Sequence, residues 1–265
     1  AIGYMARLLV QVTMPHSKPV VNEFERSNGG MTIRMLAPSQ IGLPYGKYPR
    51  LLMAWITTEA VRTRSQVLEL GDSLKGFMEQ LGIEHHPTGG ARGNVTLLRD
   101  HMRRLFSAMV SWTYDGKDQE LEVGFRPIEK RQLWWDPKNP DQVNLWKSTI
   151  TLNKTFFDEV VHHPVPVDMR VLKALANESG PMALDIYCWL TYRTSYLKKE
   201  QLIPWELLQL QFGGDYKRTR AFKEKFVDRL KLVRTLYRQV DCSVDPDGLI
   251  LAPTSRPHIP KISQA

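Results

Sequence analysis

Three cations, Lys217, Arg218 and Arg220, stand at the start of the helical pattern in residues 213–233. The helix dipole places about half a positive charge at that end, so each exposed cation there costs a few tenths of a kcal/mol. A polyanion outside the helix would offset this cost. Arginine at the leading end of a helix suits the guanine edges and phosphates of duplex DNA. The chemistry that these residues favour is therefore DNA recognition.

An apolar stripe indicates which side of this helix faces outward. Its members recur at helical spacing and are Phe222, Phe226, Leu230 and Val233. Asp215 can cap the helix start. We predict that Arg218 and Arg220 contact base edges. The remaining candidates at the leading end, mainly for phosphates, are Tyr216, Lys217, Thr219 and Lys223.

The same pattern occurs earlier in the chain at a constant offset of 125 residues. It pairs Gly89 with Gly214, Leu97 with Phe222, Arg104 with Arg229 and Leu105 with Leu230. The first stripe is predicted to be Leu98, Met102, Leu105 and Met109, widened by Leu97 and His101. The corresponding DNA-binding candidates are Arg92, Asn94, Thr96, Arg99 and Arg103. This helix carries fewer charges near its start, so we expect it to contribute less to recognition of the DNA sequence.

Each copy has the order long apolar helix, short helix, glycine-containing turn, basic helix and strands. Pro181 is predicted to open a long helix that runs to about Lys198, and Pro204 a short one. Hairpins are expected around Asp115-Gly116 and around residues 245–248, each directly after a basic helix. Further strands are predicted at 6–14, 31–36, 131–136 and 144–152.

This order predicts an α+β fold of two tandem winged-helix domains, each a helix-turn-helix with a β-hairpin wing. We place an N-terminal domain at 1–162 and a C-terminal domain at 163–265, with the joint at HHPVPV. Lys130, Arg131 and Lys147 are candidates for contacts from the first wing, and a solvated loop is an equal alternative. Ordinary solvated faces are the alternative for the helices, with Arg99, Arg103, Lys225 and Arg229 paired to Asp100, Glu224 and Asp228.

The composition agrees with a DNA-binding protein. The chain has 265 residues, with 36 Lys and Arg against 28 Asp and Glu, a net charge of +8 that favours a polyanionic partner. It contains no apolar run of 18 residues, so no membrane partner is expected. Its two cysteines lack metal-site spacing, so neither a metal nor a cofactor is expected. No signal peptide opens the sequence, and Ala1 in place of Met suggests a trimmed chain.

Catalytic interpretations rest on fragments of motifs. HMRR places His101 and Arg104 at the HxxR spacing of tyrosine recombinases, but His101 falls on the apolar stripe. The pairs at 85–86 and 162–163 lack the apolar residue between the histidines that an HUH nicking motif has. The pair Trp134-Trp135 could stack bases, although core packing is favoured. We therefore expect no enzymatic activity and keep a strand-nicking or strand-transfer enzyme as the alternative.

Long segments of the chain resemble the plasmid-encoded RepA-type replication initiators. The most specific are GLPYGKYPRLLMAWITTEAVRTRS at 42–65 and LELGDSLKGFMEQLGI at 68–83, and the similarity extends over nearly the whole sequence. The resemblance implies a plasmid replication initiator that binds repeated origin sequences (iterons) in double-stranded DNA, helps open the origin and recruits host initiator and helicase proteins. It also implies a homodimer in equilibrium with a monomer, repression of its own gene, and a bacterial cytoplasmic location on plasmid or nucleoid. A purely transcriptional repressor of the same fold is a further alternative.

Overall fold

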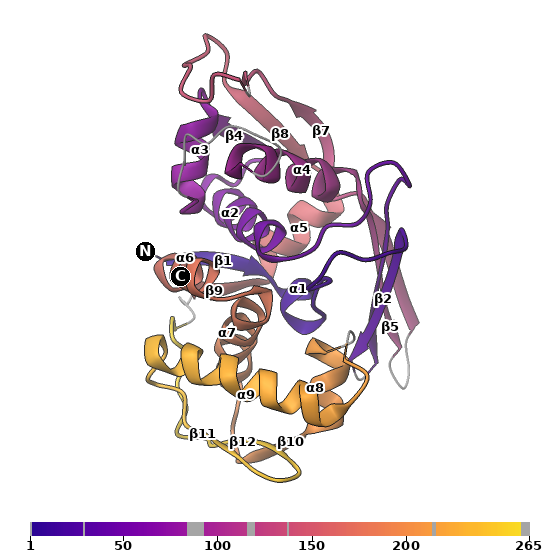
Figure 1. Cartoon of the computed structure of the whole chain (residues 1–265), viewed down its shortest axis with the longest axis vertical. Coiled ribbons are helices and arrows are strands. Elements are labelled where there is room, and N and C mark those ends of the chain that lie inside the picture. Colours follow the sequence, from indigo (N-terminus) through magenta and orange to yellow (C-terminus); the bar gives the residue numbers. More distant parts are fainter. Residues whose placement is uncertain are drawn as a thin grey trace.

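Two winged-helix units lie one above the other along the long axis of the molecule (Figure 1). The computed structural model describes residues 2–28, 30–83, 93–115, 120–136, 138–213 and 216–260. The mixed α+β class and the tandem winged-helix arrangement that the sequence predicted are confirmed.

The second half shows the winged-helix order in its simplest form. Its three strands form an antiparallel sheet in the order β10-β12-β11, so the first strand lies beside the last. The stripe of α9 is buried as predicted, against α7 and α8. The helix opened by Pro181 ends at Thr194 rather than near Lys198, and Pro204 closes a strand rather than lying inside the short helix. The elements are α7 (Pro181–Thr194), β10 (Gln201–Pro204), α8 (Trp205–Phe212), α9 (Thr219–Leu236), β11 (Cys242–Val244) and β12 (Gly248–Leu251).

The first half repeats this order with an insertion. Its sheet runs β4-β8-β7, so β7 and β8 form the wing, and the strands β5 and β6 stand between the basic helix and this wing. The sequence predicted the hairpin directly after the basic helix as the wing, and that prediction is wrong. The elements are α2 (Lys47–Thr63), β4 (Val67–Gly71), α3 (Leu74–Leu81), α4 (Asn94–Ser107), β7 (Ile128–Gln132) and β8 (Ser148–Leu152).

The misassigned hairpin belongs to a separate four-stranded sheet. Its strands pair in the order β2-β3-β5-β6, and the sheet lies along the right side of the molecule, where β2 reaches α8 of the second half (Figure 1). The expected turn at Asp115-Gly116 extends outside the described residues. Met109 lies on β5 and is exposed, and Phe106 is the last buried residue of α4 instead. The strands are β2 (Glu23–Asn28), β3 (Met31–Leu36), β5 (Met109–Asp115) and β6 (Glu120–Phe125).

A two-stranded sheet joins the halves. Strand β1 pairs antiparallel with β9, from Ile2 opposite Asp168 to Ala6 opposite Pro164, so residues 164–167 of the predicted joint lie in a strand. His162 is the last residue of the preceding helix. Residues 6–14 do not form the predicted strand, because residues 7–11 make a short helix that buries Leu8 and Val10. The elements are β1 (Ile2–Ala6), α1 (Arg7–Gln11), α5 (Lys154–His162), β9 (Pro164–Asp168) and α6 (Met169–Glu178).

A buried ion pair connects the two long helices of the halves. Arg50 of α2, 2% exposed, donates from Nε and Nη2 to the two carboxylate oxygens of Asp185 on α7, each at 2.7 Å. Its other N–H groups bond to the carbonyls of Met14, Pro15 and Gly46. His16 Nε2 donates to the same carboxylate at 2.7 Å. Because a buried guanidinium requires such complete pairing, this network fixes how α2 lies against α7.

A second polar contact holds the two halves together closer to the helix-turn-helix. Arg26 of β2 donates to the backbone oxygen of Gln211 at the end of α8 and to both oxygens of Thr13. Gln211 returns a hydrogen bond from Nε2 to the carbonyl of Val10 at 3.1 Å. All three side chains are buried. The four-stranded sheet is therefore attached to the second half by a satisfied buried network.

Candidate nucleic-acid interface

The leading end of α9 presents cations to solvent. Arg218 occupies the N-cap position without a side-chain cap, and Lys217 and Arg218 are exposed. Arg220 is 89% exposed and pairs with Glu224 at 3.1 Å. The alternative considered from the sequence paired Lys225 and Arg229 with acids such as Glu224 and Asp228, and one such pair is present, between Arg229 and Asp228 at 3.2 Å. An exposed i,i+4 pair is worth only a few tenths of a kcal/mol, so Arg220 can exchange it for a base or phosphate.

The packing of the turn before α9 requires a glycine at position 213. A Cβ on Gly213 would lie 2.4 Å from the ring of Phe222, the first member of the buried stripe. The Tyr216 ring is half-buried and packs edge-on against the same phenylalanine, with ring centroids 5.9 Å apart. Tyr216, which the sequence assigned to phosphates, therefore also shapes the turn. Asp215, the predicted cap, lies outside the described residues.

Lys223 holds the second wing against the recognition helix. Its Nζ donates to the carbonyls of Asp245 and Pro246 in the turn between β11 and β12, at 3.2 and 3.1 Å. The ammonium also lies 4.8 Å from the centre of the Trp205 ring. The sequence predicted a phosphate contact for Lys223. The structure shows a lysine that positions the wing, an arrangement that helical periodicity alone could not indicate.

The first recognition helix, α4, presents fewer charges. Thr96, Arg99 and Arg103 are exposed, and Asn94 accepts a hydrogen bond from the Tyr48 hydroxyl at 3.2 Å. Asp100 pairs with Arg104 at 2.6 Å, and not with either arginine that the alternative named. Arg92, also predicted to contact DNA, lies outside the described residues.

Two of the three predicted wing cations are exposed on β7 itself. Lys130 and Arg131 lie in a strand whose first residue alone is buried. Lys147, next to β8, pairs with Glu69 at 2.6 Å. The three cations therefore lie on the wing of the first half, although the sequence placed that wing on another hairpin.

His101 lies in the core of the first half. Its ring stacks on Tyr48 and meets Tyr45 edge-on, with centroids 5.0 and 4.9 Å apart. Its Nδ1 has no hydrogen-bond partner among the described residues. Burial lowers the pKa of His101 from 6.5 to about 4. The structure therefore supports the packed-histidine interpretation of the HxxR spacing.

This histidine is expected to make folding acid-sensitive. The folded-state pKa lies below the unfolded value, so the stabilising contribution is complete above pH 6.5 and decreases as the pH falls toward 4. The loss amounts to on the order of 3 kcal/mol. We expect His101→Phe, which copies Phe226 of the second half, to reduce this loss in urea unfolding followed at pH 7 and pH 4.5. His163→Phe, at an exposed site, should leave it unchanged. Equal acid sensitivity of His101→Phe and wild type would contradict the assignment.

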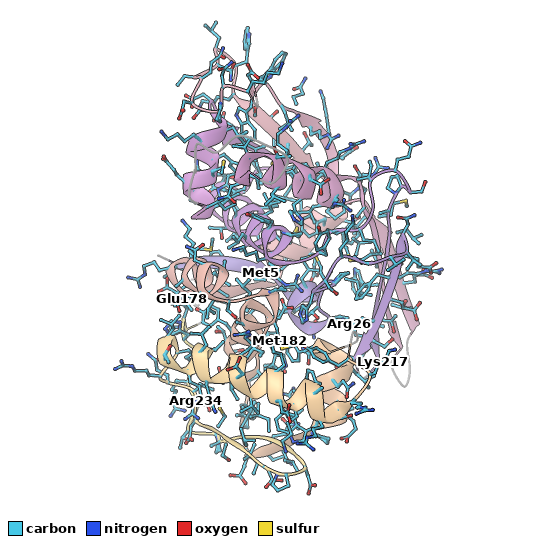
Figure 2. All side chains as sticks on the ribbon, viewed as in Figure 1. Met5, Arg26, Glu178, Met182, Lys217 and Arg234 are labelled. Atoms are coloured by element: carbon cyan, nitrogen blue, oxygen red, sulfur yellow. The ribbon has the colours of Figure 1, made fainter. Side chains whose placement is uncertain are left out.

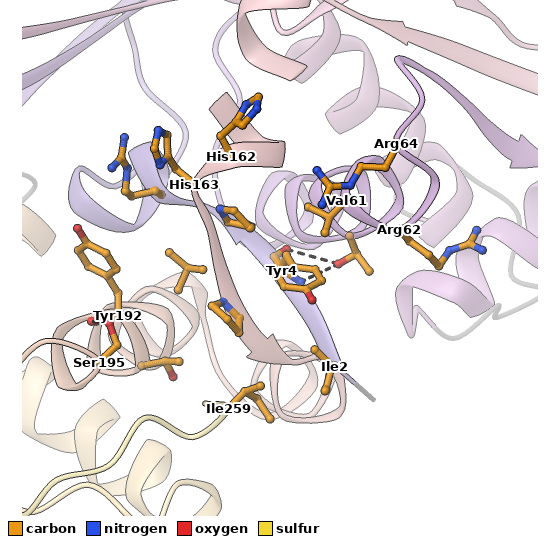
Figure 3. Close-up of a pocket in the computed structure, with 16 residues that line it drawn as sticks. Ile2, Tyr4, Val61, Arg62, Arg64, His162, His163, Tyr192, Ser195 and Ile259 are labelled. Carbon is orange, nitrogen blue, oxygen red and sulfur yellow. Dashed lines mark hydrogen bonds between the residues drawn. The ribbon is translucent and has the colours of Figure 1, made fainter. Parts of the chain in front are cut away.

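A groove of about 680 Å³ lies at the joint between the halves (Figure 3). Tyr4, Arg62, Arg64, His162 and His163 are among the side chains that line it. Part of its positive charge is neutralised, because Arg62 pairs with Glu59. None of the predicted DNA-binding side chains lines this groove. We therefore place the candidate interface on the recognition helices and wings.

The described residues contain no group of three His, Cys, Asp or Glu side chains placed to hold a metal ion. No helix in this part of the chain has the length and apolar character needed to cross a membrane.

The fold, the exposed cations at the start of α9 and the exposed arginines of α4 define a tandem winged-helix DNA-binding protein. The family model of plasmid-encoded RepA proteins matches residues 43–207, so the chain belongs to this family, as the sequence resemblance indicated. A comparison with curated proteins found no match. Membership makes the chain a plasmid replication protein.

Two crystal structures of RctB domains 2 and 3 share the fold. One, of selenomethionine derivatives, has a TM-score of 0.60 at 11% identity and covers 92% of this chain and 96% of that chain. The other, of RctB residues 155–483, has a TM-score of 0.55 at 10% identity, with coverages of 92% and 94%. At this identity the likeness concerns the fold, and it extends over both halves.

Proposed function

We propose that the chain initiates plasmid replication by binding repeated origin sequences in duplex DNA. In this proposal α4 and α9 enter successive major grooves, which requires contacts about one helical turn, roughly 10 base pairs, apart. The chain makes and breaks no bond. It opens the adjacent DNA and recruits host initiator and helicase proteins, as a monomer in equilibrium with a homodimer that represses its own gene.

The observation that carries the proposal is the leading end of α9. The buried stripe fixes the helix against α7 and α8 while Lys217, Arg218 and Arg220 face solvent at the positive end of the helix dipole. No acid except Glu224 has an ion pair with these three cations among the described residues. A duplex would supply the negative charge that the folded chain does not.

A footprint on the DNA that flanks the coding region tests the proposal. We expect several protected segments of one repeated sequence, and an origin-only plasmid should replicate when the protein is supplied from elsewhere. Protection without replication would identify a repressor. Incubation with supercoiled origin plasmid, with and without a divalent metal, provides the second test. Relaxed circles or a covalent protein-DNA adduct would show a nicking enzyme and overturn the binding mechanism.

A further inference from the structure

Exposed apolar side chains lie in the segment between β7 and β8, at the end of the first wing (upper end of Figure 1). Leu145 is 93% exposed and Trp146 is 66% exposed. We call this set the apolar wing tip; its members are Leu133, Trp134, Val143, Leu145 and Trp146. The sequence pointed only to the Trp134-Trp135 pair, and Trp135 packs against Phe77 with ring centroids 5.2 Å apart.

Hydrogen bonds hold the apolar wing tip in place from both sides. Asn144, between Val143 and Leu145, bonds through its backbone N–H and its side-chain amide to the carbonyl of Asp72, at 3.1 and 3.2 Å. The Trp134 N–H bonds to the hydroxyl of buried Ser148 at 2.9 Å. Leu145 and Trp146 are therefore presented to solvent by a fixed backbone. Such presentation reduces the entropy cost of binding.

The first wing contacts the helices of its own half in the same way as the second wing does. In the second half the wing turn makes two contacts. Lys223 of the recognition helix bonds to it, and the backbone N–H of Trp205, at the start of α8, bonds to the Asp247 carbonyl at 3.2 Å. The first wing has the same place in its sheet and the same kind of contact, from Lys75 N–H at the start of α3 to the Pro140 carbonyl at 3.0 Å.

We propose that Leu145 and Trp146 enter the minor groove beside the major groove that α4 occupies, and unstack one base step there. This rests on the proposed function and names the element that begins opening of the duplex. Apolar wedges in the minor groove kink DNA and separate adjacent bases, and an indole can cover the exposed base face. The exposed cations Lys130 and Arg131, on β7 shortly before the apolar wing tip, favour DNA over a protein partner, because they can hold the flanking phosphates.

Permanganate oxidation of unstacked thymines tests this inference. The probe is the duplex that wild-type protein selects from a random-sequence pool, probed with wild type and with Leu145→Ala/Trp146→Ala. We expect about tenfold lower thymine reactivity at one step for the variant, with an affinity within about tenfold of wild type. The control is Leu210→Ala, which removes an exposed apolar side chain from α8 and should leave the reactive thymine unchanged.

The outcomes separate this inference from the proposed function. Equal reactivity with wild type and the double variant would overturn the wedge and leave origin binding intact. A change in oligomeric state of the free double variant, with unchanged reactivity, would assign the apolar wing tip to contact with a second copy. Failure of the wild type to select or bind any duplex would overturn both proposals.

Discussion

Arg218→Ala/Arg220→Ala is expected to bind its selected duplex at least about 30-fold more weakly than wild type while binding to random duplex changes far less. Two base contacts of about 1 to 3 kcal/mol each are removed, and base contacts carry sequence information where phosphate contacts do not. Breaking the Arg220–Glu224 pair costs little free energy when DNA binds, because both side chains are exposed. Fluorescence anisotropy titrations on both duplexes at two salt concentrations measure the difference.

The far end of the same helix supplies the control. Figure 2 shows Arg234 near the end of α9 opposite to Lys217, so Arg234→Ala removes a cation from the same element without touching its leading end. We expect it to change affinity little and specificity not at all. Lys217→Ala should weaken binding to all duplexes and reduce the salt slope by about one. Equal losses on both duplexes for the arginine variant would contradict base recognition.

Asp185→Ala is expected to destabilise the protein by about 3 to 5 kcal/mol, because it leaves the Arg50 charge buried without a counter-ion. That is a large part of the roughly 5 to 15 kcal/mol that stabilise a typical domain. Urea unfolding followed by circular dichroism at pH 7 measures the loss. Although burial raises the pKa of Asp185, the nearby charge of Arg50 and the hydrogen bonds from His16 and Arg50 lower it overall. The pair is therefore charged at that pH.

Two further variants test whether the loss of stability in Asp185→Ala comes from leaving a charge buried. Glu23→Ala breaks the exposed pair with Arg34 and should cost no more than about 1 kcal/mol. Arg50→Met/Asp185→Leu removes both charges, and we expect it to cost less than Asp185→Ala alone. An Arg50→Met/Asp185→Leu variant that is less stable than Asp185→Ala would contradict the explanation by an unpaired buried charge.

The periodicity of the sequence was enough to predict the two recognition helices. The stripe of α9 is buried over its whole predicted length, because helical spacing decides which side chains can share one face. The 125-residue offset placed α4 correctly for the same reason. The predicted stripe of α4 failed at Leu97, which is only partly buried, and at Met109, where the chain changes to strand. Local patterns place such boundaries least well.

Long-range pairing could not be predicted from these patterns. The hairpin β5–β6 directly follows the basic helix, whereas β7 reads IEKRQ without alternation, and only the pairing of β4 with β8 shows that β7–β8 is the wing. The Arg50–Asp185 pair joins residues 135 positions apart. The apolar residues around Asp185 mark it as buried, but they do not identify its partner. Lys223 has helical spacing typical of an exposed cation, and the wing turn that it contacts is distant in sequence.

The pairing of β1 with β9 affects how the chain is made. On the ribosome, residues 2–6 are synthesised long before their partner residues 164–168, which emerge only after the whole first winged helix has been made. Until then the nascent chain carries an unsatisfied strand edge, the kind of surface that pairs with neighbouring chains on a crowded polysome. Closing so distant a contact is also slow, since the chain entropy between the strands must be lost first. Residues 2–6 can therefore reach their native place only after residues 164–168 have been translated.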